Sequence, residues 1–219
     1  QVMNRFMLIV LVFLSTALYI ACSPKEKIFI IAPGDPIAAN AGFTLTDYLS
    51  KTYHGMSFEF SETEIEGYRN IVLKISASGE LENDESFRIS GTADQLFITG
   101  KSSRALVNGV YDLLKQIGWS FYLSYDVPPA EPELLNFTEI QIENTPLIEK
   151  RIVFNWHNFL SGCSSWDFEH WQDWIDNSEK IGFNTIMVHA YGNNPMHSFT
   201  FNGVEKEMGF LSTTQHGRD

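Results

Sequence analysis

The amino-acid sequence predicts an α/β protein, in which a small α/β sandwich is followed by the first βαβ unit of an incomplete (β/α)8 barrel. Between residues 28 and 142, short apolar segments typical of strands alternate with two segments of helical periodicity. After residue 146, a strand, a helix and a second strand follow one another, and each strand runs into a cluster of polar side chains. We therefore expect three parts: a leader over residues 1–22, a sandwich over 23–145 and the start of a barrel over 146–219.

Composition and charge exclude several classes of protein. Of the 219 residues, 44% are hydrophobic and 14% aromatic, which is too much apolar surface for a disordered chain. The 15 basic and 27 acidic residues give a formal net charge of −12, and no basic patch stands out, so we expect no nucleic-acid partner. The two cysteines cannot form a disulfide framework, and we assign no chemistry to Cys163.

The first 22 residues have the pattern of a secretory signal peptide. Arg5 precedes an apolar run of about 15 residues that ends at Ala21-Cys22. Ala21-Cys22 resembles the lipobox of bacterial lipoproteins, which implies lipidation of Cys22 after cleavage, although Tyr19 stands where that motif prefers leucine. The sequence thus predicts an exported protein anchored to a membrane, in the periplasm or at the cell surface. An uncleaved anchor, or a cleaved signal with an incidental cysteine, remain the alternatives.

The elements of the sandwich follow from local patterns. Residues 27–32 form an apolar strand, and residues 37–53 carry apolar side chains at helical spacing. Four further strands are expected at 58–60, 70–75, 85–89 and 95–99, with a hairpin at the Gly91–Asp94 break. A second helix begins after Ser102 or Ser103 and stops at Gly118. Strands at 120–124 and 136–142 flank a loop over 127–132, and we expect a largely antiparallel sheet.

Acidic side chains are frequent in this part, but they lie mostly in predicted loops and strand edges. A solvated acidic surface accounts for them better than a catalytic pair does. They are Glu59, Glu62, Glu64, Glu66, Glu80, Glu82, Asp84 and Glu85.

Three segments of the sandwich resemble a known domain. They are Glu85–Ile89, Leu96–Gly100 and Arg104–Leu114, and they are similar to the α/β domain that precedes the barrel in exported glycoside hydrolases: β-hexosaminidases, α-glucuronidases and α-N-acetylglucosaminidases. The resemblance implies a hexosaminidase domain-2-like, non-catalytic domain. It also implies that Gly109 lets the second helix approach the sheet closely.

The last part begins a barrel. Residues 147–154 form a strand that ends in Asn155-Trp156-His157-Asn158, and residues 183–190 form a second strand followed by Tyr191, Asn193 and Asn194. Between them, Ser164 or Ser165 is expected to cap a helix that Gly182 ends. Phe168, Trp171, Trp174 and Ile175 are expected to share its buried face. A (β/α)8 barrel needs about 250 residues, so we expect this one to be incomplete.

Two resemblances concern this part. Trp166-Asp167-Phe168 with Trp171, and Gly182-Phe183-Asn184, resemble the first barrel helix of α-N-acetylglucosaminidases. Arg151–Asn158 is similar to the first barrel strand of α-glucuronidases, where a polar and aromatic cluster lines the sugar site, although Trp and His are exchanged here and its acidic residue is missing. Both families hydrolyse glycosidic bonds with carboxylates from later strands. None of the acids here matches one, so the catalytic carboxylates are expected beyond Asp219.

The residue types at the strand ends suit a carbohydrate. Asparagine amides donate to and accept from sugar hydroxyls, and aromatic rings stack on the apolar face of a pyranose. His157 and His189 suit a hydroxyl or the carboxylate of an acidic sugar; structural histidines are the alternative, and two histidines without a carboxylate are a weak metal signal. The expected substrate-binding residues are Asn155, Trp156, His157, Asn158, Trp166, His189, Tyr191, Asn193 and Asn194.

The sequence thus predicts the N-terminal part of a lipoprotein glycoside hydrolase acting in the degradation of poly- or oligosaccharides. We expect no cofactor and no metal, and no activity from the 219 residues alone. Two alternatives stay open at this point. One is a glycan-binding surface lipoprotein without hydrolysis, and the other is a metal-dependent hydrolase that uses His157 and His189.

Overall fold

The computed structural model describes residues 26–76, 81–155, 163, 166–187 and 198–207. The predicted leader and Cys22 therefore lie outside the described residues. The chain divides into two compact units: unit 1 comprises residues 1–120 and 127–146, and unit 2 comprises residues 121–126 and 147–219. Among the described residues, no helix combines the length and the hydropathy that a bilayer crossing would require.

Unit 1 is built on a mixed sheet with the strand order β2-β1-β3-β5-β4-β8. β1 is parallel to β2 and β3, β3 is parallel to β5, and β4 is antiparallel to β5 and β8. The expectation of a largely antiparallel sheet is therefore wrong, because crossovers rather than hairpins join most of these strands. The strands are β1 (Glu26–Ile31), β2 (Met56–Ser61), β3 (Arg69–Ile75), β4 (Phe87–Gly91), β5 (Gln95–Gly100) and β8 (Gln141–Asn144).

Side-chain caps begin both helices of unit 1. In α2 (Pro36–Thr52), the Asp35 carboxylate accepts hydrogen bonds from the amides of Ile37 and Ala38, each at 3.0 Å. In α3 (Ser103–Gln116), the Ser102 hydroxyl accepts from the Ala105 amide at 3.2 Å. Gly118, with φ +107°, ends α3 as predicted, because glycine adopts this left-handed conformation without steric cost.

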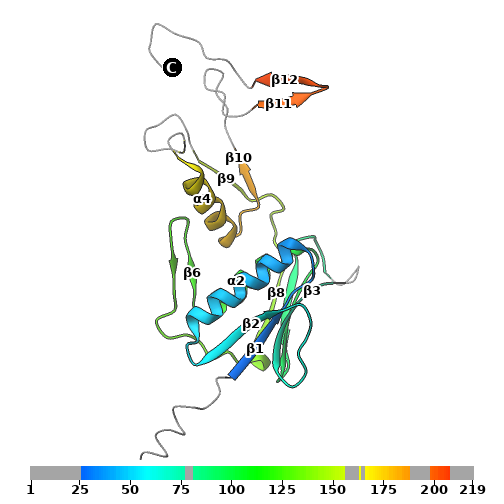
Figure 1. Cartoon of the computed structure of the whole chain (residues 1–219), viewed down its shortest axis with the longest axis vertical. Helices are drawn as coiled ribbons and strands as arrows, with labels where there is room; N and C mark the ends of the chain where they lie inside the picture. Colours follow the sequence, from blue (N-terminus) through cyan, green and yellow to red (C-terminus); the bar gives the residue numbers. More distant parts are fainter. Residues whose placement is uncertain (1–25, 77–80, 156–162, 164–165, 188–197, 208–219) are drawn as a thin grey trace, which may run out of the picture. The chain divides into compact units, whose positions relative to one another are not determined.

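Both helices pack on the sheet and against each other, which makes a two-layer sandwich. Figure 1 shows α2 lying across the strands. The core between the layers is aliphatic and aromatic. Gly109 of α3 lies directly over the sheet, because a Cβ there would come within 2.7 Å of Cγ2 of Ile98. The predicted role of Gly109 in close helix-to-sheet packing is confirmed. Fully buried members of the core include Ile28, Ile30, Leu45, Ile71, Phe87, Leu96, Ile98 and Leu106.

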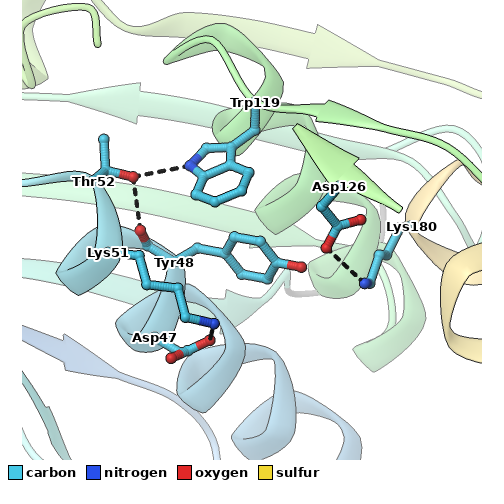
Figure 2. Close-up of polar contacts among 7 residues, drawn as sticks. All are labelled: Asp47, Tyr48, Lys51, Thr52, Trp119, Asp126 and Lys180. Carbon is cyan, nitrogen blue, oxygen red and sulfur yellow. Dashed lines mark hydrogen bonds and ion pairs between the residues drawn. The ribbon is translucent and has the colours of Figure 1, made fainter. Parts of the chain in front are cut away.

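The segment after α3 differs from the expected pair of strands. Instead of 120–124 and 136–142, the structure has a short hairpin of β6 (Ser120–Phe121) and β7 (Asp126–Val127), and later η1 (Phe137–Glu139), a 3-10 turn before β8. Phe137 fills the end of the core, and the Arg69 guanidinium lies 3.9 Å from its ring centroid. Trp119 donates its indole N–H to the Thr52 hydroxyl at 2.9 Å, which ties the end of α3 to α2 (Figure 2).

Unit 2 contains a βαβ unit. β9 (Ile152–Phe154) and β10 (Thr185–Met187) are parallel neighbours, and α4 (Phe168–Lys180) connects them. The predicted opening of a (β/α)8 barrel is thus present, with strands shorter than the sequence ranges 147–154 and 183–190. Further along, β11 (Ser198–Phe201) and β12 (Val204–Glu207) form an antiparallel hairpin through Asn202 and Gly203, both with positive φ.

Candidate functional site

The candidate site is placed by the pairing of β9 with β10. Their register joins Ile152 to Thr185 and Phe154 to Met187, so the carboxyl ends of both strands lie at the same edge. In a (β/α)8 barrel this edge carries the substrate. Asn155 comes directly after β9 at this edge. Of the nine expected substrate residues, Asn155 and Trp166 are described, whereas Trp156, His157, Asn158, His189, Tyr191, Asn193 and Asn194 lie outside the described residues.

Cys163 connects the two described site residues. Its thiol donates to the backbone carbonyl of Asn155, with the sulfur 3.7 Å from the oxygen, and its own carbonyl accepts from the amide of Trp166 at 3.3 Å. The side chain is buried, and this burial raises the pKa of the thiol. A protonated thiol is a hydrogen-bond donor and a poor nucleophile. Cys163 therefore acts on the site through the backbone, a role that its isolated position in the sequence did not indicate.

Trp166 packs in a cluster of three tryptophans at the start of α4. Its ring centroid lies 5.4 Å from that of Trp171 and 5.9 Å from that of Trp174, and both contacts are edge-to-face. Trp171 and Trp174 meet in the same way at 5.8 Å. Trp166 stays half-buried, so its ring keeps an accessible part. Edge-to-face packing fixes the orientation of that ring before any ligand arrives.

The expected buried face of α4 is only partly correct. Trp174 is buried as predicted and Trp171 is half-buried, but Phe168 is 79% and Ile175 is 41% exposed. The buried stripe passes through Trp174 and Ser178. At 100° per residue, Phe168 and Ile175 lie about 80–100° around the helix axis from that stripe. The sequence pattern therefore predicts too wide a buried face.

Asp167 caps α4, and not Ser164 or Ser165 as predicted. Its Oδ1 accepts from the backbone amide of His170 at 3.0 Å and lies 2.6 Å from Nδ1 of the same residue. An aspartate is favoured over a serine at this position because its charge also suits the positive end of the helix. The backbone hydrogen bond from His170, followed by the side-chain bond, lowers the pKa of Asp167 below its ordinary value of 3.8.

The lowered pKa of Asp167 predicts a pH-dependent cap. A carboxylate whose folded pKa is lowered stabilises the fold fully above its unfolded pKa, near 3.8, and loses this effect as pH falls through the folded value. We expect the urea midpoint of Asp167→Asn to lie below that of the parent chain at pH 6, and the difference to vanish below the folded pKa. Asp167→Ala, which also lacks the capping acceptor, should stay less stable at every pH. Equal midpoints of the Asn variant and the parent at pH 6 would contradict the prediction.

At the opposite end of the strands, Asn184 joins the start of β9 to the start of β10. Its Oδ1 accepts from the Arg151 amide at 3.0 Å and from the Thr185 hydroxyl at 3.0 Å, while its Nδ2 donates to the Glu149 carbonyl at 2.7 Å. Arg151 adds a bond from Nε to the Gly182 carbonyl at 2.5 Å. We call Arg151 and Asn184 the strand clasp. The sequence signal for it was the Gly182-Phe183-Asn184 resemblance, which gave no role to the asparagine.

Unit 1 has a hollow of about 690 Å³ near the β4–β5 turn. Two acidic side chains of this unit, Glu64 and Glu59, are paired with other side chains of the fold. Glu64 accepts from the Gln95 amide at 2.6 Å, and the side chain of Asn70 holds the adjoining loop through Ile65 and Tyr68. Glu59 pairs with Lys27 at 2.7 Å. Within the described part of the chain, no three His, Cys, Asp or Glu side chains converge on a possible metal position. The lining residues are Glu64, Ile65, Glu66, Gly67, Tyr68, Asn70, Thr92, Asp94 and Gln95.

Comparisons with known proteins find similarity of fold to solved structures and no similarity that defines a family. No family model and no curated protein matches the chain. Among solved structures, an N-acetyl-β-hexosaminidase of Streptomyces plicatus is 21% identical with a TM-score of 0.53, over 75% of this chain and 30% of its own. A GH20 β-N-acetylhexosaminidase of Streptomyces coelicolor A3(2) is 21% identical with a TM-score of 0.52, over 77% and 31%. A GH115 4-O-methyl-α-glucuronidase with specificity for decorated arabinogalactans is 14% identical with a TM-score of 0.54, over 74% and 25%.

The alignments with these solved structures include residues of both units. Unit 1 makes up less than two thirds of the chain, so an alignment over 75% of it includes part of unit 2. The chain spans about a quarter to a third of the length of these solved chains. At such identities the likeness concerns the fold. The fold of this chain is an α/β sandwich followed by the opening βαβ unit of a barrel, and its solved neighbours are glycoside hydrolases.

Proposed function

We propose that the chain is the N-terminal part of a glycoside hydrolase that is exported and held at a membrane by a lipid on Cys22. The order of the two units along the chain supports the proposal of a hydrolase. A sandwich followed by a βαβ unit aligns with N-acetylhexosaminidases and with an α-glucuronidase, and the alignment extends past the boundary between the units. The neighbours are enzymes, which supports hydrolysis over glycan binding without turnover. Labelling with radioactive palmitate, abolished in Cys22→Ser, tests the anchor.

The proposed substrate site lies at the carboxyl ends of β9 and β10. Asn155 contributes an amide at the end of β9, where the Cys163 thiol fixes its backbone carbonyl. Trp156, His157 and Asn158, with His189, Tyr191, Asn193 and Asn194, are proposed to complete the polar and aromatic lining. Asparagine amides and aromatic rings together recognise the two chemical faces of a sugar, hydroxyls at its edge and C–H groups on its flat side.

The proposed chemistry is cleavage of a glycosidic bond by a pair of carboxylic acids. One acid protonates the leaving oxygen, and the other acts either as a nucleophile or as the base that activates water. We propose that both come from later barrel strands, outside the 219 residues. The residues at the ends of β9 and β10 then bind and orient the terminal sugar. The activities of two neighbours suggest the classes of substrate to test first, a terminal N-acetylhexosamine and a terminal glucuronic acid or its 4-O-methyl form.

The test compares turnover with and without the sequence that follows Asp219 in the gene. We expect the extended protein to hydrolyse 4-nitrophenyl N-acetyl-β-glucosaminide or 4-nitrophenyl α-glucuronide, and the 219 residues alone to be inactive on both. In the extended protein, His157→Ala should lower kcat/KM by about 10- to 100-fold, the effect of losing one strong hydrogen bond to substrate.

Two controls accompany this test. His54→Ala removes an exposed histidine of unit 1 and should leave kcat/KM unchanged. Addition of EDTA should have no effect, and inhibition by EDTA that zinc reverses would favour the metal-dependent alternative. Turnover by the 219 residues alone would overturn the placement of the acids.

A further inference from the structure

The β6–β7 hairpin ends in a tip rich in exposed aromatic surface. The tip consists of Tyr122, Leu123, Ser124 and Tyr125, and the amide of Tyr122 donates to the carbonyl of Tyr125 at 3.1 Å. Tyr122 is 50% and Tyr125 is 60% exposed, and Leu123 between them is 40% exposed. We call these four residues the tyrosine tip. Two large rings exposed on one turn make this tip a candidate for binding.

The two rings form one surface. Their centroids are 5.2 Å apart and their planes are inclined by 32°, so each ring supports the other and leaves much of its own area open. A tyrosine ring offers an apolar face and a phenolic hydroxyl next to it. The C–H face of a pyranose and its equatorial hydroxyls need that combination.

Side chains of α4 hold the tip in place. The Asn177 amide donates to the Leu123 carbonyl at 3.1 Å, and the Lys180 ammonium donates to Asp126 Oδ2 at 2.8 Å and to Asn177 Oδ1 at 3.0 Å. The side chains of Lys180 and Asp126 are only 17% and 19% exposed, and Figure 2 shows their ion pair. A turn fixed at both ends loses little conformational entropy when a ligand binds.

The charges around the tip favour a neutral ligand. None of its four residues is charged, and the ammonium of Lys180 beside it is paired with Asp126. The whole chain carries a net charge of −12, which opposes the approach of an anionic membrane or a polyanion. A neutral stretch of polysaccharide suffers no such repulsion, and it offers the C–H faces that stack on tyrosine.

The tip lies away from the candidate substrate site. Asn177 and Lys180 are in the last turn of α4, whereas Asp167 and Trp166 are at its start, on the side of Asn155. A helix of 13 residues is about 20 Å long. Tip and strand ends are therefore separated by about the length of α4.

We propose that the tyrosine tip is a second carbohydrate-binding surface, which holds a neutral segment of a glycan at a distance from the bond that is cut. This rests on the proposed function for the presence of a polysaccharide, but binding at the tip needs no catalysis. Such a surface keeps the enzyme on an insoluble or branched polymer between successive cleavages. It would raise activity on polymers without changing activity on small aryl glycosides.

The test is affinity electrophoresis of the full chain in native gels that contain glycol chitin, hydroxyethyl cellulose or arabinogalactan. We expect the parent chain to be retarded in at least one gel. The double variant Tyr122→Ala/Tyr125→Ala should bind that polymer at least 10-fold more weakly. Tyr122→Leu/Tyr125→Leu keeps apolar bulk on the turn but removes the flat rings, and it should lose retardation equally. Tyr68→Ala removes an equally exposed tyrosine from unit 1 and should migrate like the parent.

Each alternative has its own result. No retardation of the parent in any gel, or unchanged retardation of both double variants, overturns the proposal. Flotation of the parent with phosphatidylcholine vesicles that is lost in the double variants would assign the tip to a membrane. A concentration-dependent dimer in light scattering that is lost in the same variants would assign it to self-association. Because no turnover is measured, an inactive parent that is still retarded would count against the proposed hydrolysis and not against the tip.

Discussion

Replacement of Gly91 by alanine is expected to lower the free energy of unfolding of unit 1 by about 3 kcal/mol, the upper range for forcing a methyl group into a packed site. Gly91 is the last residue of β4, and a Cβ there would overlap the backbone carbonyl of Phe137. The carbonyl cannot rotate away as a side chain would. Nor can η1 retreat without exposing the Phe137 ring, which is buried under Arg69.

The measurement is hydrogen exchange of the β4 and β5 amides in the full chain, since a protein with two units need not unfold in one step. Gly55→Ala is the matched control, because no atom lies within 4 Å of a Cβ built on Gly55 and its φ is not positive. The control should change stability by less than about 0.5 kcal/mol. Equal protection of β4 in the Gly91 and Gly55 variants would refute the steric argument.

Loss of the strand clasp is expected to cost unit 2 about 1–3 kcal/mol when Asn184 is replaced by alanine. The change removes the partners of the half-buried Arg151 amide and of the exposed Glu149 carbonyl before β9, and each such hydrogen bond contributes about 0.5–1.5 kcal/mol net. We expect faster exchange of the β9 and β10 amides, while those of β3 and β5 in unit 1 keep their protection.

Asn184→Asp tests the bond to Glu149 by itself. The aspartate still accepts from the Arg151 amide and the Thr185 hydroxyl, but a carboxylate oxygen replaces the donor that faced the Glu149 carbonyl, so the loss at that bond should remain in full. A variant with aspartate as stable as the parent would mean that the bond to Glu149 contributes nothing. If the alanine variant also matched the parent, the clasp would have no part in holding the strands.

The helices of unit 1 could be predicted from the sequence because their ends depend on neighbours in the chain. Asp35 and Ser102 cap their helices through amides two or three residues away, and Gly118 ends α3 by its own backbone conformation. The start of α4 shows the limit of this reasoning. Ser164, Ser165 and Asp167 are all suitable caps, and only the folded chain selects Asp167.

The strand directions could not be predicted in the same way. The Gly91–Asp94 hairpin is local and follows from the sequence, whereas β2 and β3 lie on either side of β1 and are joined by residues 62–68. A short connection between two apolar segments usually suggests a hairpin, and nothing in residues 62–68 shows that β1 runs between them. The parallel order is thus a property of the assembled sheet and of no single segment.

In the candidate site, too, local features could be predicted from the sequence and contacts between distant residues could not. The position of Asn155 at the end of a barrel strand follows from a local pattern, and the structure has it there. The hydrogen bond from Cys163 to its carbonyl, the clasp through Asn184 and the tyrosine tip join residues far apart in the chain. Tyr122 lies within 120–124, which the sequence predicts to be a regular strand, because an aromatic run is typical of strands as well as of exposed turns.

The insertion of residues 121–126 into unit 2 has a consequence for how this protein can be divided or recombined. The polypeptide passes between the units three times, after residues 120, 126 and 146. A fragment that starts at residue 147 lacks Asp126 and the Leu123 carbonyl, so Lys180 and Asn177 lose the partners they have here. Unit 1 is therefore not an exchangeable cassette with a single linker. A chimera that grafts another sandwich onto this barrel must transplant the β6–β7 hairpin together with the receiving barrel.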